Sequence, residues 1–242
     1  QRDEGKQGNQ RFVSSRMRTK WWVDNMTAKR EVKSSVKDEK LIEMRREQMS
    51  QGAVKLFKEK WFHRTTTREI AKEAGFSIGT LYEYIRTKED VLFLVCDSIY
   101  EEVLNRLSVF AIEDGNVAGL KSAIHQYFTL IDDMSDEFVV MYQETKSLPK
   151  DALQYVLKKE MEMVALFENI LQSCVKLGEL RINQDDIQIA AHHIVVQGQM
   201  WAFRRWALQK NYTIEKFIEV QTDQIFKGIV GTGEIHEEGK GV

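Results

Sequence analysis

The sequence predicts an all-α protein. The chain of 242 residues contains a single proline, and no stretch of it reads as a run of strands. Apolar residues instead recur at spacings of three and four, which is the period of a helix with one buried face. A hydrophobic content of 43% is enough to form one large core or two smaller ones.

Several classes of protein are disfavoured by the composition. We expect no membrane partner, because no apolar run reaches the length of a membrane span, and the start does not resemble a signal peptide. Cys96 and Cys174 are isolated and far apart, so the sequence predicts neither a disulfide scaffold nor a zinc site. These features favour a cytoplasmic location.

The first helix is expected over residues 38–60. Its buried stripe consists of Met49, Ala53, Leu56 and Phe57. A second helix is expected to begin at Thr66, because Thr66 can cap it and Glu69 can reach back to the cap. Gly75 then ends it, since glycine readily adopts the left-handed backbone of a tight turn.

A third helix follows that turn, with Ser77 as its cap, and runs from Ile78 to about Ile85. Two short helices joined by a short turn containing glycine form a helix-turn-helix, whose second helix enters a DNA major groove. We expect Leu81 and Ile85 to face the core, and five other residues to point elsewhere: Ile78, Gly79, Thr80, Tyr82 and Tyr84.

The chemistry of this third helix favours nucleic-acid binding. Gly79 costs helix stability, which is understandable if the backbone passes close to DNA. Thr80 can contact base edges, whereas Tyr82, Tyr84 and Lys88 can donate to phosphates. The alternative is a small helical hairpin with solvated tyrosines.

Charge is distributed unevenly along the chain. Residues 1–95 carry 21 Lys and Arg against 14 Asp and Glu, whereas residues 96–242 carry 14 against 23. A basic N-terminal part would attract a polyanion and an acidic body would avoid it. Residues 1–37 form a polar, basic extension, which we interpret as partly disordered or, alternatively, as an arm that lies along DNA.

The remaining chain reads as further helices. A long amphipathic helix is expected to open at Lys88 and to continue through Leu107, and it would link the first domain to a body. Further helices are expected at about 117–133, 136–147, 150–177, 185–209 and 214–229. The sequence therefore predicts three parts: residues 1–37, a helix-turn-helix domain over 38–90, and a helical domain over 91–242.

The N-terminal pattern resembles the TetR/AcrR family of bacterial regulators. The matching residues are Ala53, Leu56, Phe57, Thr65, Thr66, Ile70, Ala71, Ala74, Gly75, Ser77, Gly79, Thr80, Leu81, Tyr82, Tyr84, Lys88 and Glu89. The resemblance covers roughly residues 45–95. Two residues depart from the family pattern: Trp61 stands where the family usually has glycine, and Ile85 where it usually has phenylalanine.

The resemblance implies how the first domain meets DNA. Thr67, Tyr82, Tyr84 and Lys88 are expected to touch phosphates, while Ser77, Ile78, Gly79 and Thr80 are expected to lie against the major groove. Because Ile78 has no hydrogen-bonding group, base reading would depend on Thr80, on apolar contacts with thymine methyls and on DNA shape.

The family resemblance also implies a ligand-binding and dimerisation bundle in the body. The candidate ligand residues are Tyr127, Phe138, Tyr142, Phe167 and Trp201, although such side chains are usually just core. The last two helices are expected to pair with their copies in a homodimer, through Gln197, Trp206, Phe217, Ile218, Gln221 and Ile225. The segment 201–210 weakly resembles regulators that sense fatty acyl-CoA, and Arg204 and Arg205 could hold a CoA phosphate or be solvated.

Catalysis has little support in the sequence. His192 and His193 are adjacent, and hence badly placed to bind one metal ion from a helix. We therefore expect no catalytic site, metal or cofactor, and we predict a homodimeric, ligand-responsive DNA-binding regulator. The expected function is that of a repressor released from a palindromic operator by a small apolar or amphipathic effector. The alternative is a DNA-binding structural or cell-division-control protein on the same fold.

Overall fold

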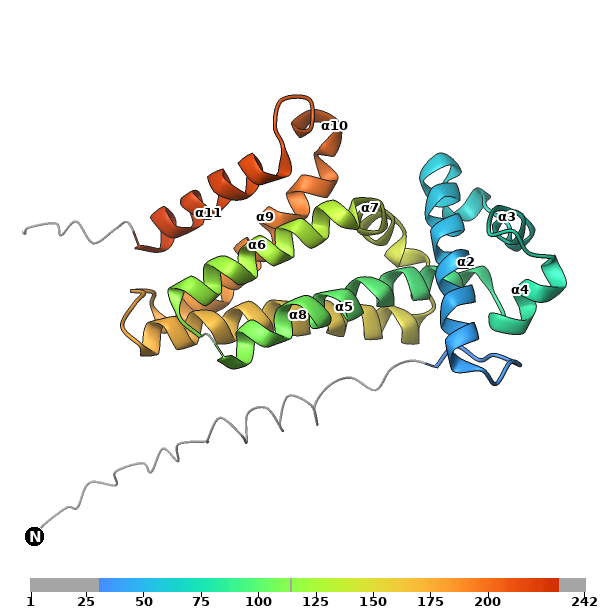
Figure 1. Cartoon of the computed structure of the whole chain (residues 1–242), viewed down its shortest axis with the longest axis horizontal. Coiled ribbons are helices and arrows are strands. Elements are labelled where there is room, and N and C mark those ends of the chain that lie inside the picture. The colour runs from blue at the N-terminus through green and yellow to red at the C-terminus, as the bar shows by residue number, and fades with distance from the viewer. Residues whose placement is uncertain (1–30, 114, 231–242) are drawn as a thin grey trace, which may run out of the picture.

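The structure is a computed structural model that describes residues 31–113 and 115–230, and every regular element in this part of the chain is a helix. The first domain contains α2 (Glu39–Lys60), the 3-10 helix η1 (Phe62–Arg64), α3 (Thr67–Glu73) and α4 (Ile78–Tyr84). The long helix α5 (Lys88–Glu113) runs from this domain into the body. Figure 1 shows an elongated molecule with α2, α3 and α4 at one end.

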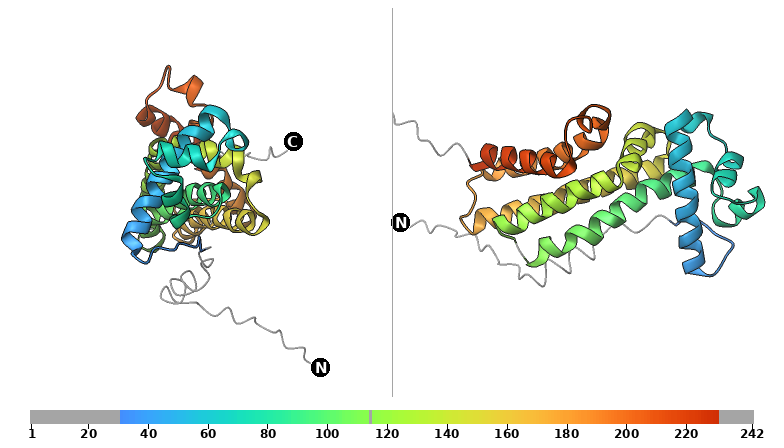
Figure 2. Two further views of the ribbon diagram at one scale, coloured as in Figure 1. Left: turned by 90° about the vertical axis from the view of Figure 1, so that its right-hand side faces the viewer. Right: turned by 45° about the horizontal axis from the view of Figure 1, so that its top comes forward.

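The body is built from the remaining helices. They are α6 (Val117–Asp133), α7 (Ser135–Glu144), η2 (Thr145–Ser147), α8 (Lys150–Lys176), η3 (Gln184–Asp186), α9 (Ile187–Phe203), α10 (Arg205–Leu208) and α11 (Ile214–Val230). The helices α5, α6, α8 and α9 pack on one another to form the core, and α11 lies on α6 and α9 (Figure 2). The all-α prediction is confirmed.

The predicted helix starts are confirmed in the first domain. The Thr66 side chain accepts a hydrogen bond from the Glu69 N–H, and the Glu69 carboxylate accepts one from the Thr66 N–H, at 2.9 Å. The Ser77 hydroxyl accepts from the Thr80 N–H at 3.0 Å. Gly75 has φ 78°, so the turn between the two helices uses the left-handed conformation that glycine permits.

Trp61 occupies a turn conformation that is unusual for its residue type. Its φ is 70°, and it is the only non-glycine residue with positive φ in the described part of the chain. The turn is held by the Thr65 hydroxyl, which donates to the Trp61 carbonyl at 3.0 Å. Trp61, which stands where the family usually has glycine, therefore adopts a backbone conformation that is common for glycine and rare for tryptophan.

Two of the predicted helices end earlier than the sequence suggested. The helix expected over 185–209 breaks at Arg204, which has φ −108° and ψ 12°, and this break separates α9 from α10. The helix expected over 136–147 ends at Glu144 and continues only as the 3-10 turn η2. Neither end carries a glycine or proline, so local sequence gave no stop signal.

The two cysteines lie in the core of the body. Cys96 in α5 and Cys174 in α8 are both fully buried and unpaired. Burial raises the pKa of the Cys96 thiol to about 12 and that of Cys174 to about 11. Both side chains therefore act as small apolar groups.

Residues 31–113 and 115–230 contain no cluster of three side chains able to hold a metal ion. Among the helices of the same ranges, none has the length and apolar character needed to cross a bilayer.

Candidate DNA-binding site and bundle core

The helix α4 is fixed to the first domain through its buried side. Leu81 and Ile85 are fully buried, as predicted from their spacing, and Ile70 of α3 is buried with them. The opposite side of α4 carries Gly79, which is exposed, and Thr80, which is half-buried. This arrangement leaves a surface with short side chains on a rigid support at one end of the molecule.

Hydroxyl groups cover that surface. The hydroxyls of Thr67 and Tyr82 lie 3.1 Å apart, and those of Ser77 and Thr80 lie 2.9 Å apart. Tyr82 is 51% exposed, although its ring is apolar. Four hydroxyls of α3, α4 and the α4 cap are thus held in two hydrogen-bonded pairs, and in each pair one hydroxyl keeps a proton that it can donate to a phosphate or a base edge.

Tyr84 does not point away from the core, and this prediction is wrong. The residue is only 4% exposed, and it packs with Leu81 and Ile85 on the buried side of α4. Ile78 is half-buried and also packs against the core, so little of it is available to a base. The exposed surface of α4 is therefore smaller than the sequence suggested.

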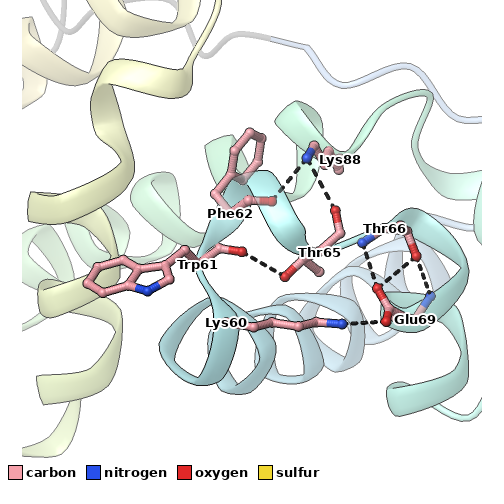
Figure 3. A network of polar contacts seen from close by, with 7 residues as sticks. All are labelled: Lys60, Trp61, Phe62, Thr65, Thr66, Glu69 and Lys88. Atoms are coloured by element: carbon pink, nitrogen blue, oxygen red, sulfur yellow. Dashed lines mark hydrogen bonds and ion pairs between the residues drawn. The ribbon is translucent and has the colours of Figure 1, made fainter.

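Lys88 makes contacts within the protein. Its ammonium group donates to the carbonyls of Phe62, at 3.0 Å, and Thr65, at 3.2 Å, and it lies 4.3 Å from the centre of the Phe62 ring. Figure 3 shows it reaching from the start of α5 to the turn before α3. Lys88 thus joins the link helix to the first domain, and its expected contact with a phosphate stays a prediction.

Glu69 organises the other half of the network in Figure 3. It accepts hydrogen bonds from Lys60 at the end of α2 and from Thr66. These donors, with Lys60 the largest contributor, lower the pKa of the Glu69 carboxyl to about 2. The start of α3 is therefore tied to α2 at neutral pH, which fixes α3 beside α4.

Replacing Lys88 with methionine is expected to lower the free energy of unfolding by about 1–3 kcal/mol, because two partly buried carbonyls lose a charged donor. Urea denaturation measures this loss. Lys72→Met serves as control, because Lys72 is exposed in α3. If Lys88→Met instead left stability unchanged and weakened only DNA binding, a phosphate contact would be the better explanation.

A segment before α2 holds the end of α4 by hydrogen bonds, a role that no sequence pattern indicated. The Ser35 N–H and the Ser34 hydroxyl both donate to the Glu83 carbonyl, each at 2.9 Å. The Arg46 guanidinium in α2 donates to the carbonyls of Val32 and Tyr84. Residues 31–37 of the predicted extension therefore lie on the first domain; residues 1–30, where the predictions of disorder or a DNA arm mostly fall, lie outside the described residues.

Four of the five candidate ligand residues lie in the body's core. Tyr127, Phe138, Phe167 and Trp201 are each at most 1% exposed. Tyr142 is 72% exposed, and its ring packs on Phe203 at 4.5 Å between centres. Its expected place in an enclosed ligand site is therefore contradicted, because α7 turns this side chain outward.

The expected dimer residues fall into two groups. Phe217, Ile218, Gln221 and Ile225 in α11 are each less than 10% exposed, because this stripe packs on the body of its own chain. The prediction that these four residues form a surface for a partner is therefore contradicted. Trp206 is 67% exposed, and Gln197 is half-buried with a side-chain oxygen that has no hydrogen-bond partner in the described part of the chain.

Another exposed surface with apolar residues lies on α9, and sequence patterning missed it because apolar residues occur around most of this helix. Ile189 is 57% exposed and Val196 is 58% exposed, and they share one face of α9 with His193. A groove of about 670 Å³ lies beside this face. Gln197 of α9 and Gln224 of α11 are among the residues that line it.

Comparisons with known proteins match both the first domain and the body of this chain. Residues 51–95 match the model of bacterial regulatory proteins of the tetR family, and residues 113–203 match that of the tetracyclin repressor-like C-terminal domain. The transcriptional regulator HbdR of Aromatoleum is 30% identical over 200 residues, covering 81% of this chain and 85% of HbdR.

Solved structures share the fold. A tetR-family regulatory protein from Rhodococcus RHA1 superposes with a TM-score of 0.69 at 21% identity, over 77% of this chain and 97% of the other. AibR in complex with isovaleryl coenzyme A and operator DNA gives a TM-score of 0.65 at 18% identity, over 75% and 98%. With a helix-turn-helix domain, a helical body and these matches along most of its length, the chain belongs to the TetR family of bacterial transcriptional regulators.

Proposed function

We propose that this protein is a homodimeric repressor that leaves a palindromic operator when a small apolar or amphipathic effector binds in the body. The observation that carries the proposal is the surface of α3 and α4, which holds two pairs of hydroxyls and the exposed Gly79. The relative AibR is described in complex with both operator DNA and isovaleryl coenzyme A, which supports both halves of the proposal.

The first domain and the body meet through polar contacts that can transmit a movement. The buried N–H of Phe62 donates to the Glu144 carboxylate at the end of α7, at 3.2 Å. Lys58 of α2 pairs with Asp136 of α7 at 2.5 Å, and Arg205 of α10 approaches the same carboxylate at 3.6 Å. A shift of α7 would therefore move α2, and α5 connects the two parts directly.

An effector acts on this joint only if it binds one arrangement more tightly than the other. In the dimer, two copies of α4 would face successive turns of the duplex, about 34 Å apart. A small rotation of each first domain would change that separation. Binding of the effector is then expected to lower operator affinity.

For the dimer surface we propose the exposed face of α9 and the adjoining groove. Changing Val196 to glutamate is expected to convert the dimer to monomer, because it places a charge in the centre of an apolar interface. Sedimentation at micromolar concentration measures the change. Leu177→Glu is the control, because Leu177 is 63% exposed at the far end of α8. If the Val196→Glu variant remains a dimer, the interface must lie on another surface.

The function itself is tested with fragments of bacterial genomic DNA. Purified protein is expected to retain a subset of fragments, with an affinity that falls steeply as salt is raised, because phosphate contacts release counterions. Footprinting should then give two half-sites related by a two-fold axis. Failure to retain any duplex at low salt would reject the proposal. If no compound in a metabolite extract releases the retained DNA, the alternative of a DNA-binding structural protein without an effector would be favoured.

A further inference from the structure

The helix α4 lacks a local sequence signal that would end it and fix its last turn. It contains seven residues, and a helix of this length is not stable without contacts from the rest of the protein. Ile85 follows it in an extended conformation, and no glycine comes next to turn the chain back onto the last carbonyls. The carbonyl groups of its last turn therefore need donors from other parts of the chain.

Two serines of the segment before α2 supply donors to the Glu83 carbonyl. It accepts from the Ser35 N–H and the Ser34 hydroxyl, each at 2.9 Å, and from the Ser35 hydroxyl at 3.2 Å. In Figure 1 this segment is the blue loop at the start of α2. Val32 is only 6% exposed and lies in the core, and Val36 packs against the core, so the segment is itself held in place.

Arg46 of α2 joins that segment to α4. Its Nε and Nη2 donate to the Tyr84 carbonyl, at 3.2 and 3.0 Å, and Nη2 also donates to the Val32 carbonyl. One planar guanidinium thus holds two stretches of backbone in a fixed geometry. A lysine ammonium has no such fork and would not reproduce this arrangement.

The residues that follow α4 are held as well. The Asp90 carboxylate at the start of α5 accepts from the N–H groups of Arg86 and Thr87, at 3.0 and 3.1 Å. At the other end of α4, Ser77 caps the helix. Both ends of α4 are therefore fixed by hydrogen bonds, and the end near Arg46 depends on residues far away in the sequence.

We propose that Arg46 is a positioning residue for DNA recognition. Together with Ser34 and Ser35 it sets the angle at which α4 enters the major groove, without touching DNA itself. Reading of base edges requires side chains placed within hydrogen-bond distance, so a tilt of α4 would lose these contacts. Contacts with phosphates carry no sequence information and tolerate a small tilt better. This inference rests on the proposed function and adds to it a residue on which operator specificity depends.

The test measures how well the full-length protein discriminates between two DNA fragments. Fluorescence anisotropy gives the affinities for a retained genomic fragment and for a scrambled fragment of equal length, and their ratio is the discrimination. Arg46→Met is expected to lower this ratio at least about tenfold. Lys40→Met is the control, because Lys40 is exposed on the same helix and its loss removes the same charge. The control should keep the wild-type ratio.

The salt dependence separates positioning from direct contact. If Arg46 does not touch a phosphate, the slope of log affinity against log salt concentration should be the same in Arg46→Met as in the wild type. Loss of one phosphate contact would instead reduce the slope by about 0.9.

Two milder changes test the same contacts should methionine at residue 46 destabilise the first domain. Arg46→Lys keeps the charge but not the fork, so its discrimination should lie between those of the wild type and Arg46→Met. The double variant Ser34→Ala, Ser35→Ala removes two hydroxyl donors and keeps the Ser35 N–H. It is expected to lower the discrimination about threefold.

Amide hydrogen exchange tests the contacts without DNA. In Arg46→Met the amides of α4 are expected to exchange at least about tenfold faster than in the wild type, whereas those of α2 keep their rates. Equal acceleration in α2 and α4 would mean that Arg46 only stabilises the domain, and it would overturn the positioning role.

Two further results would overturn that role: unchanged discrimination in Arg46→Met, or a reduced salt slope with equal loss of affinity for both fragments. Failure of the wild-type protein to retain any DNA would reject the proposed function itself. Normal retention by the wild type together with any of the overturning results rejects only the role of Arg46.

Discussion

Replacing Gly79 with leucine is expected to reduce operator affinity by more than about 100-fold while leaving the fold intact. A Cβ at this position would meet only the Ser77 hydroxyl oxygen, at an ordinary 3.6 Å. Within the described residues nothing therefore requires glycine at this position, and Gly79 lies in the first turn of α4, where a better helix former should not destabilise the helix. Close approach of a major groove would instead favour a residue without a side chain at this exposed position.

The measurement is fluorescence anisotropy with a retained DNA fragment, beside thermal unfolding of the same samples. Gly79→Ala should lie between wild type and Gly79→Leu in affinity, and both variants should melt at or above the wild-type temperature. Gln126→Leu provides the control, because Gln126 is exposed on α6 in the body. Affinity that does not depend on the size of the side chain at residue 79 would show that α4 does not dock closely.

The largest loss of stability is expected for Trp201→Ala, at about 3–5 kcal/mol. Trp201 is 1% exposed, its ring lies 5.0 Å from that of Phe217, and its indole N–H donates to Asp132 at 2.7 Å. It therefore connects α9 with α6 and α11. Removal leaves a large cavity and an aspartate without its donor.

Urea denaturation of the two variants Trp201→Ala and Trp206→Ala gives the comparison. Trp206 is 67% exposed, and its truncation is expected to cost the protomer less than about 1 kcal/mol. Equal losses at the two positions would mean that α9 is not held to α6 as described. Asp132→Asn should recover part of the stability lost in Trp201→Ala, since a neutral side chain replaces the unpaired carboxylate.

Much of the first domain could be predicted because its signals are local. Thr66 with Glu69, Ser77, and Gly75 each act within a few residues, so the starts of α3 and α4 and the turn between them follow directly from the sequence. Tyr84 could not be placed in the same way. A helix of seven residues has too few positions to define its buried face, and both tyrosines fit a helical pattern.

The surfaces of the body were harder to predict because they depend on distant elements. The stripe containing Phe217 and Ile225 was correctly identified as apolar, but a stripe does not say whether it covers its own chain or a partner. Glu160 of α8 accepts hydrogen bonds from Gln199 of α9 and Tyr100 of α5, so this polar cluster joins three helices that are far apart in sequence. Its members could be brought together only by the fold.

The two buried cysteines can report experimentally on opening of the body. Because the Cys96 and Cys174 thiols are enclosed and poorly ionised, a thiol reagent can label them only when the body opens. Cys96 lies one turn before Tyr100 on α5, whereas Cys174 lies near the far end of α8. The ratio of the two labelling rates would therefore distinguish a local separation around α5 from unfolding of the whole bundle, without any engineered probe.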